Sequence, residues 1–149
     1  MVRVVAQRAR AASVRVEQHV VGEIGCGLAV LVGIREGDTE HAVEKVADKL
    51  AALRIFEDSE GKMNLSARDV GGDMLVVSQF TLYADVRKGR RPSFIQAADP
   101  ATGQRLYEHF MARLATQGYR VECGQFGAHM LVTIENEGPV TIVLDSEEM

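Results

Sequence analysis

The chain has 149 residues, of which 46% are hydrophobic and 26% are charged, and its formal net charge is −4. A chain of this length can bury a substantial core, so we expect residues 1–149 to form a single domain. The composition excludes a disordered or fibrous protein, and the negative charge argues against a protein that coats itself with nucleic acid, so any nucleic-acid contact should be local and we expect no DNA partner.

Location and metal content are predicted from what the sequence lacks. No stretch approaches the ~20 apolar residues of a membrane helix, and the first residues alternate Val and Arg in place of a signal-peptide core. We therefore expect a cytoplasmic protein with no membrane partner. Cys26 and Cys123 lie far apart and have no metal-like spacing to the histidines, which predicts reduced thiols and no metal site.

The first third of the chain is predicted to form strands. Residues 2–9 and 13–17 alternate β-branched and polar residues, and residues 28–34 are typical of a core strand. The glycines at 22, 25 and 27 are interpreted as turns. Their order differs from the dinucleotide-binding pattern, and no strand-to-helix junction follows them directly.

Two helices and four further strands complete the predicted fold. Apolar residues recur at helical spacing between residues 39 and 54, with Asp38 as the N-cap. The second helix follows Asp99-Pro100 and ends before Gly118. Strands are predicted at residues 74–81, 119–122, 130–135 and 140–144. The pattern indicates a β-rich α/β or α+β domain without internal repeats.

The segment from residue 74 to residue 94 is the most informative part of the chain. An apolar strand continues into Ser78, Gln79, Phe80 and Thr81, and if it stays extended, Gln79 and Thr81 share one face. Polar residues that continue a core strand need hydrogen-bond partners within the protein or from a ligand. Four cations follow within five residues: Arg87, Lys88, Arg90 and Arg91. This edge suits an anionic ligand, although a solvated loop is the alternative interpretation.

The residues alone do not identify a nucleophile or its base. There is no G-x-S-x-G, no H-E-x-x-H, and no histidine near Ser78 or Thr81 in the sequence. Thr81 is a candidate nucleophile, but threonine is also common in strands for its β-branched shape. Gly138-Pro139 is a second unusual feature, for which a plain turn and a ligand site both stay open.

Three segments together resemble the D-aminoacyl-tRNA deacylase family: residues 78–83, 88–94 and 136–141. The resemblance spans nearly the whole chain. Gln7-Arg8 with residues 12–14 is similar to the opening of the family's sequences, and residues 54–58, 61–64 and 71–72 are similar to their middle.

The resemblance implies a homodimer with a β-rich α/β fold, a mixed barrel-like sheet and two main helices. It implies a proofreading hydrolase without a cofactor, which cleaves the ester between a D-amino acid, or glycine, and the 3′ end of tRNA. In this chain the resemblance assigns the catalytic pocket to Ser78, Gln79, Phe80 and Thr81. It assigns substrate binding to Gly138, Pro139, Met130 and Arg8, and tRNA binding to Arg87, Lys88, Arg90 and Arg91.

The implied mechanism explains the missing base. In the family a cis Gly-Pro pair reaches into the partner subunit's pocket and excludes L-amino acids. D- and L-substrates differ only in the arrangement around one carbon, so a rigid obstacle can discriminate between them, whereas attractive contacts elsewhere cannot. The terminal 2′-hydroxyl of the tRNA assists the attack, while amides near Phe80 and Thr81 supply the oxyanion hydrogen bonds. Two alternatives are weighed against this function. They are an esterase with Thr81 as nucleophile and a non-catalytic tRNA-binding module.

Overall fold

The computed structural model describes residues 1–149 and is built on one six-stranded sheet. The strand order is β2-β1-β3-β6-β7, and β8 pairs with β1. The strands of this sheet are β1 (Arg3–Val16), β2 (His19–Ile24), β3 (Gly27–Gly33), β6 (Asp73–Ser78), β7 (Val121–Cys123) and β8 (Leu131–Asp145). A separate hairpin consists of β4 (Phe56–Glu57) and β5 (Met63–Leu65).

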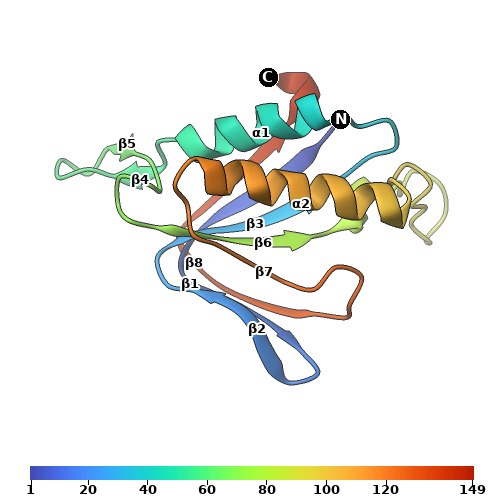
Figure 1. Cartoon of the computed structure of the whole chain (residues 1–149), viewed down its shortest axis with the longest axis horizontal. Helices are drawn as coiled ribbons and strands as arrows, with labels where there is room; N and C mark the ends of the chain where they lie inside the picture. Colours follow the sequence, from blue (N-terminus) through green and yellow to red (C-terminus); the bar gives the residue numbers. More distant parts are fainter.

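Two helices cover one face of the sheet. They are α1 (Glu40–Ala52) and α2 (Pro100–Thr116), which lie side by side in Figure 1, with both chain ends near α1. Two short 3-10 turns, η1 (Phe80–Tyr83) and η2 (Ser146–Glu148), follow β6 and β8. Neither helix is long and apolar enough to cross a membrane.

The core lies on both faces of the central parallel strands. β6 runs parallel to β3 and β7, and such strands are buried on both faces and read as continuous apolar runs. Met74, Leu75 and Val76 of β6 are accordingly fully buried. The larger core cluster packs under the helices, and the smaller one packs between the β3–β6 face and the first half of β8.

The sheet curls into a nearly closed barrel because β1 changes neighbours along its length. Its first half pairs with β3, its second half pairs with β2, and both halves pair with β8. On the far side β2 approaches β7, where the Glu23 N–H donates to the Glu122 carboxylate at 3.4 Å. A side chain at Gly22 would overlap the carbonyl of Cys123, so glycine permits this approach. The mixed, barrel-like fold with two helices is confirmed.

Several strand predictions are wrong in their boundaries. The two segments predicted at 2–9 and 13–17 merge into one 14-residue strand, Arg3–Val16. Those predicted at 130–135 and 140–144 merge into one 15-residue strand, Leu131–Asp145, which contains Gly138 and Pro139. Register shifts between β1 and β8 at residues 7–11 absorb the irregular sequence without ending either strand. Gly22 and Gly27 likewise lie within β2 and β3, not in turns.

The helix boundaries are confirmed for α2 and corrected for α1. The Asp99 carboxylate accepts the Thr102 N–H at 3.1 Å, as expected of an N-cap. For α1 the cap is Thr39, whose hydroxyl accepts the Ala42 N–H at 3.2 Å. Asp38 is not the cap, because its carboxylate instead binds the N-terminal amine and the Arg35 N–H.

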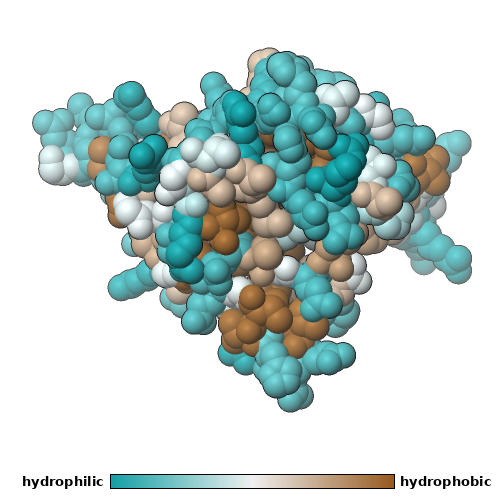
Figure 2. Space-filling model, viewed as in Figure 1, coloured by the Kyte–Doolittle hydropathy of each residue, from teal (hydrophilic) through white to brown (hydrophobic).

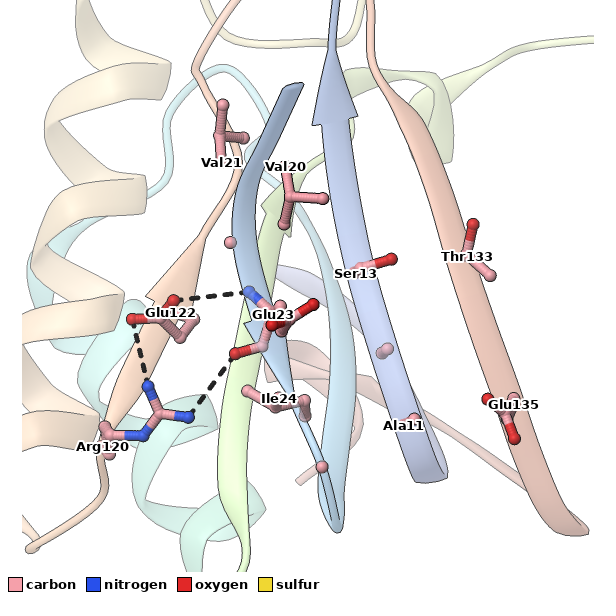
Figure 3. Close-up of a pocket in the computed structure, with 13 residues that line it drawn as sticks. Ala11, Ser13, Val20, Val21, Glu23, Ile24, Arg120, Glu122, Thr133 and Glu135 are labelled. Atoms are coloured by element: carbon pink, nitrogen blue, oxygen red, sulfur yellow. Dashed lines mark hydrogen bonds and ion pairs between the residues drawn. The ribbon is translucent and has the colours of Figure 1, made fainter. Parts of the chain in front are cut away.

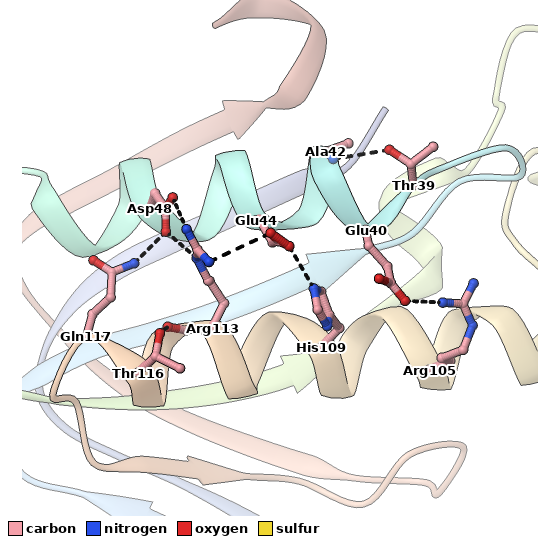
Figure 4. A network of polar contacts seen from close by, with 10 residues as sticks. All are labelled: Thr39, Glu40, Ala42, Glu44, Asp48, Arg105, His109, Arg113, Thr116 and Gln117. Atoms are coloured by element: carbon pink, nitrogen blue, oxygen red, sulfur yellow. Dashed lines mark hydrogen bonds and ion pairs between the residues drawn. The ribbon is translucent and has the colours of Figure 1, made fainter.

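A ladder of charged pairs joins the two parallel helices (Figure 4). Glu40 pairs with Arg105 at 2.8 Å, Glu44 with His109 at 3.1 Å, and Asp48 with Arg113 at 2.8 Å. Each step advances four residues on both helices, which brings successive side chains to the same face. Because these side chains are partly exposed, each pair contributes little to the stability of the fold. The two helices are held in place mainly by the apolar side chains buried between them and the sheet.

Candidate active site

The polar segment at the end of β6 begins at a carboxyl edge of the sheet. Ser78 is in register with Val32, and the Gln79 N–H donates to the Val32 carbonyl at 2.8 Å. β3 ends one residue later at Gly33, so its pairing with β6 ends with this hydrogen bond and the chain turns into η1. The expectation of an extended strand through Thr81 is therefore wrong.

Gln79 and Thr81 nevertheless come together. The Gln79 side-chain Nε2 donates to Thr81 Oγ1 at 3.0 Å. The two side chains lie on the same side, as strand alternation predicted, but the 3-10 turn places them there. The first N–H groups of a helical turn have no acceptor within it, and in η1 these belong to Phe80 and Thr81. The turn thus presents backbone donors beside a hydroxyl and an amide.

The N-terminal strand holds η1 in position. Arg3 Nη1 donates to the Leu82 carbonyl at 3.0 Å, and the guanidinium carbon lies 5.0 Å from the centre of the Tyr83 ring. The Tyr83 hydroxyl donates to the Met1 carbonyl, and burial raises the pKa of this phenol. Gly33 lies beneath the turn, where an added Cβ would come 3.0 Å from Leu82 Cβ.

A pocket of about 450 Å³ opens beside this turn. Its residues come from the ends of β3 and β6, from η1, from the connection between β7 and β8 and from the start of β8: Leu31, Val77, Ser78, Gln79, Phe80, Thr81, Ala128, Met130, Val132 and Ile134. None of these side chains is ionisable. The pocket therefore offers hydrogen bonds and apolar contact but no general base of its own.

An aromatic pocket of about 420 Å³ adjoins the first. The two share Ser78, Phe80, Ala128 and Met130. Phe94 and Phe126 line the second pocket, and the Phe80 and Phe94 rings meet edge to face with centroids 5.1 Å apart. Sequence reasoning missed both as site residues, because single aromatic residues in loops are indistinguishable from packing residues.

Gly138 and Pro139 do not line either pocket of their own chain. The peptide bond between them is cis, and both residues are exposed on β8 opposite Arg8. Arg8 is in register with Leu28 of β3, whereas Ser78 is in register with Val32. Four residues along a strand correspond to about 13 Å, so the pair lies well away from the pocket.

Arg8 supports the Gly138 segment from beneath. The residue is only 8% exposed, and its side chain donates from Nε to the Glu137 carbonyl at 3.0 Å and from Nη1 to the Ile55 carbonyl at 3.0 Å. It also lies 3.7 Å from a Glu57 carboxylate oxygen. Arg8 thus contacts the backbone immediately before Gly138, while its role in substrate binding stays a prediction.

The cationic loop begins where η1 ends. Asp85 and Ser93 exchange two backbone hydrogen bonds that close the loop, and in Figure 1 it extends beyond the N-terminal end of α2. Arg87 is held by Asp85 through contacts of 2.9 Å and 2.7 Å, and this pairing lowers the pKa of Asp85 to about 2. Lys88, Arg90 and Arg91 are exposed and form no ion pair.

The largest surface cavity lies elsewhere and carries no comparable chemistry. It measures about 750 Å³ and lies among β1, β2, β7 and β8 (Figure 3). Its cation, Arg120, is already bound to Asp73 at 3.0 Å and Glu122 at 3.3 Å. Apart from this group the polar lining is acidic at Glu23 and Glu135, which does not suit the anionic ligand expected from the sequence, so we place the candidate site at η1.

No metal centre is visible in the chain. No three His, Cys, Asp or Glu side chains gather where they could hold an ion, and both cysteines are free.

The sequence profile of the family described as D-Tyr-tRNA(Tyr) deacylase matches residues 5–145. The chain belongs to the D-aminoacyl-tRNA deacylase family. This membership makes the protein a hydrolase, as the resemblance of its motifs implied.

Relatives named D-aminoacyl-tRNA deacylase match this family member over nearly its full length. The protein of Thermotoga petrophila is 54% identical over 147 residues, covering 99% of both chains. That of Brevibacillus brevis is 58% identical over 144 residues, covering 97% of this chain and 99% of the relative.

Solved structures share the fold of this deacylase family member. One described as c-Myc DNA Unwinding Element Binding Protein has a TM-score of 0.90 at 40% identity and covers 96% of this chain and 97% of its own. One described as a probable eukaryotic D-amino acid tRNA deacylase has a TM-score of 0.82 at 23% identity, covering 96% of this chain and 98% of its own, and supports the fold alone.

Proposed function

We propose that this deacylase hydrolyses the ester between a D-amino acid and the 3′-terminal adenosine of tRNA, and that one domain, residues 1–149, performs the reaction. The observation that carries the proposal is the pocket at the end of β6. It combines the Gln79 and Thr81 side chains and the first N–H groups of η1 with a lining that has no ionisable side chain. A tRNA substrate places this activity in the cytoplasm.

The two adjoining pockets suit the two halves of the substrate. The aromatic pocket offers Phe80, Phe94 and Phe126 to the adenine, and stacking of a base on an aromatic ring contributes about 1–3 kcal/mol. The aliphatic pocket receives the aminoacyl group. The ester then lies at the shared wall, beside Ser78 and Phe80.

Catalysis in this proposal needs no protein nucleophile. Water attacks the ester carbonyl carbon, the N–H groups of Phe80 and Thr81 stabilise the oxyanion, and the bond to the 3′-oxygen breaks with transfer of a proton to that oxygen. The terminal 2′-hydroxyl of the RNA positions the water. Loss of one oxyanion donor in other hydrolases costs about 10²–10³ in rate, so preorganised donors can account for a large part of the acceleration.

Chiral selection is proposed to come from a second copy of the chain. Gly138 and Pro139 are exposed and do not reach their own pocket, which fits an insertion into the pocket of a partner. Apolar surface is available for such contact, because Leu131 and Val143 on β8 are 64% and 62% exposed. Figure 2 shows a further apolar patch at the lower end, over the β2 region, where Val20 and Val21 are exposed.

The exposed cations after η1 are proposed to contact the acceptor phosphates. A protein that binds mainly a single-stranded 3′ end needs few such contacts and can be acidic elsewhere. Lys88, Arg90 and Arg91 make no ion pair within the chain, so they are available to phosphates.

The decisive experiment compares D-tyrosyl-tRNA with L-tyrosyl-tRNA on the same tRNA. We expect hydrolysis of the D-form only, and equal rates would refute the function.

Glycyl-tRNA should also be cleaved, because glycine has no side chain for the filter to exclude. A tRNA that ends in 2′-deoxyadenosine should react at least about tenfold more slowly if the hydroxyl assists. Light scattering tests the dimer.

A further inference from the structure

Gly124, just after β7, leaves a space that the side chain of Met130 fills. The Gly124 N–H donates to the Val76 carbonyl at 3.3 Å, which ties this backbone to β6. A Cβ added to Gly124 would come 2.5 Å from Met130 Sδ and 3.4 Å from Val14 Cγ1. Because the first distance is too short for van der Waals contact, any side chain at position 124 must displace the thioether.

The direction of that displacement follows from the surroundings. Val14 is fully buried and lies against the same Gly124 position, so the core offers no room on that side. The open space next to Met130 is the site, because Met130 lines both the aliphatic and the aromatic pocket. A displaced thioether therefore moves into the site, and the methionine side chain is flexible enough to do so without a change of the backbone that leads into β8.

We infer that Gly124 determines which aminoacyl groups the site accepts, by keeping Met130 out of the space that a large side chain needs. Gly124 touches no substrate, so it is a positioning residue that acts through Met130. The inference rests on the proposed function, since the space matters only if an aminoacyl group occupies the pocket. A small side chain such as that of D-alanine fits even when the wall moves inward.

The variant Gly124→Ala is suited to the test because only the far end of a flexible side chain has to move. Gly25→Ala is the matched control, since an added Cβ there meets nothing within 4 Å. Hydrolysis of D-tyrosyl-tRNA and D-alanyl-tRNA is measured for both variants, for Met130→Ala and for the double variant Gly124→Ala/Met130→Ala.

For Gly124→Ala we expect a loss of about tenfold with D-tyrosyl-tRNA and less than about threefold with D-alanyl-tRNA. The double variant should recover the rates of Met130→Ala, and the Gly25→Ala control should match the wild type. Equal losses on both substrates, no loss, or no recovery in the double variant would overturn the inference.

A second measurement separates this inference from the proposed function. With ¹³C-methyl methionine, the Met130 signal, assigned with Met130→Ala, should shift in Gly124→Ala and stay unchanged in Gly25→Ala. An unchanged signal would refute the contact whatever the activity. A wild type inactive on every D-aminoacyl-tRNA, with the shift present, would instead refute the proposed function.

Discussion

The Arg8 guanidinium donates to the carbonyl oxygen of Glu137 at 3.0 Å, immediately before Gly138. A second donor of the same side chain binds the Ile55 carbonyl at 3.0 Å, so one buried cation joins β8 to the segment that follows α1. The backbone proposed to form the chiral filter is therefore supported by a charged hydrogen bond from β1.

Replacing Arg8 with lysine should weaken the filter. An ammonium group cannot reproduce the planar fork that reaches both carbonyls, so we expect a loss of about 1–3 kcal/mol in the free energy of unfolding. The preference for D- over L-tyrosyl-tRNA should also fall. Urea unfolding and paired hydrolysis rates measure the two effects. Arg10→Lys, on an exposed residue of the same strand, serves as the control and should change neither.

Removing the Thr81 hydroxyl should leave most of the activity. The hydroxyl accepts from Gln79 and has no ionisable neighbour in the pocket to activate it. We expect Thr81→Val to retain activity within about tenfold of the wild type, the scale of one lost hydrogen bond. Near-complete loss, together with an acyl-enzyme detected by mass spectrometry in the wild type, would favour the esterase with Thr81 as nucleophile.

The cations of the loop should contribute unequally to tRNA binding. Lys88→Ala, Arg90→Ala and Arg91→Ala should each weaken binding and reduce the slope of log affinity against log salt by about 0.7 to 0.9, if each cation contacts one phosphate. Arg87→Ala should have a smaller effect because Asp85 already neutralises Arg87. Titrations of uncharged tRNA at several salt concentrations would show this order, and equal effects at all four positions would contradict it.

The contact between Asp48 and Arg113 should make stability depend on pH. Hydrogen bonds from Arg113, with a further one from Gln117, lower the pKa of Asp48 in the folded state. Such a group stabilises the fold above its unfolded pKa of about 4 and loses that effect as the pH falls through the folded value. Asp48→Asn should therefore be less stable than the wild type at pH 7, and the difference should narrow towards pH 3.

Urea midpoints across this pH range provide the measurement. Arg113→Gln should reproduce the narrowing, since it removes the same hydrogen bonds. If the stability difference between Asp48→Asn and the wild type stayed constant with pH, the pairing with Arg113 would not lower the pKa of Asp48.

Local sequence patterns were sufficient to predict the helices and the central strands. α2 carries an N-cap at Asp99 and ends before Gly118, and β6 is an unbroken apolar run. Caps and apolar runs depend on residues only a few positions apart in the sequence, and the structure contains both as predicted.

Long-range pairing accounts for what the sequence could not predict. β1 and β8 stay continuous because they pair with each other on both sides of their irregular residues. This pairing joins residues far apart in the sequence, so neither segment alone predicts it. The turn at Phe80 depends on β3 ending at Gly33, 47 residues earlier in the chain. Phe94 and Phe126 become site residues only when folding brings their loops beside Met130.

The absence of ionisable side chains from the candidate pocket also bears on the breadth of the proposed activity. A pocket without charge cannot tell an acidic amino acid from a basic one by attraction or repulsion. One protein of this kind can then act as a generalist that distinguishes handedness at a single carbon. Any preference among amino acids would have to come from their size or from the tRNA that carries them.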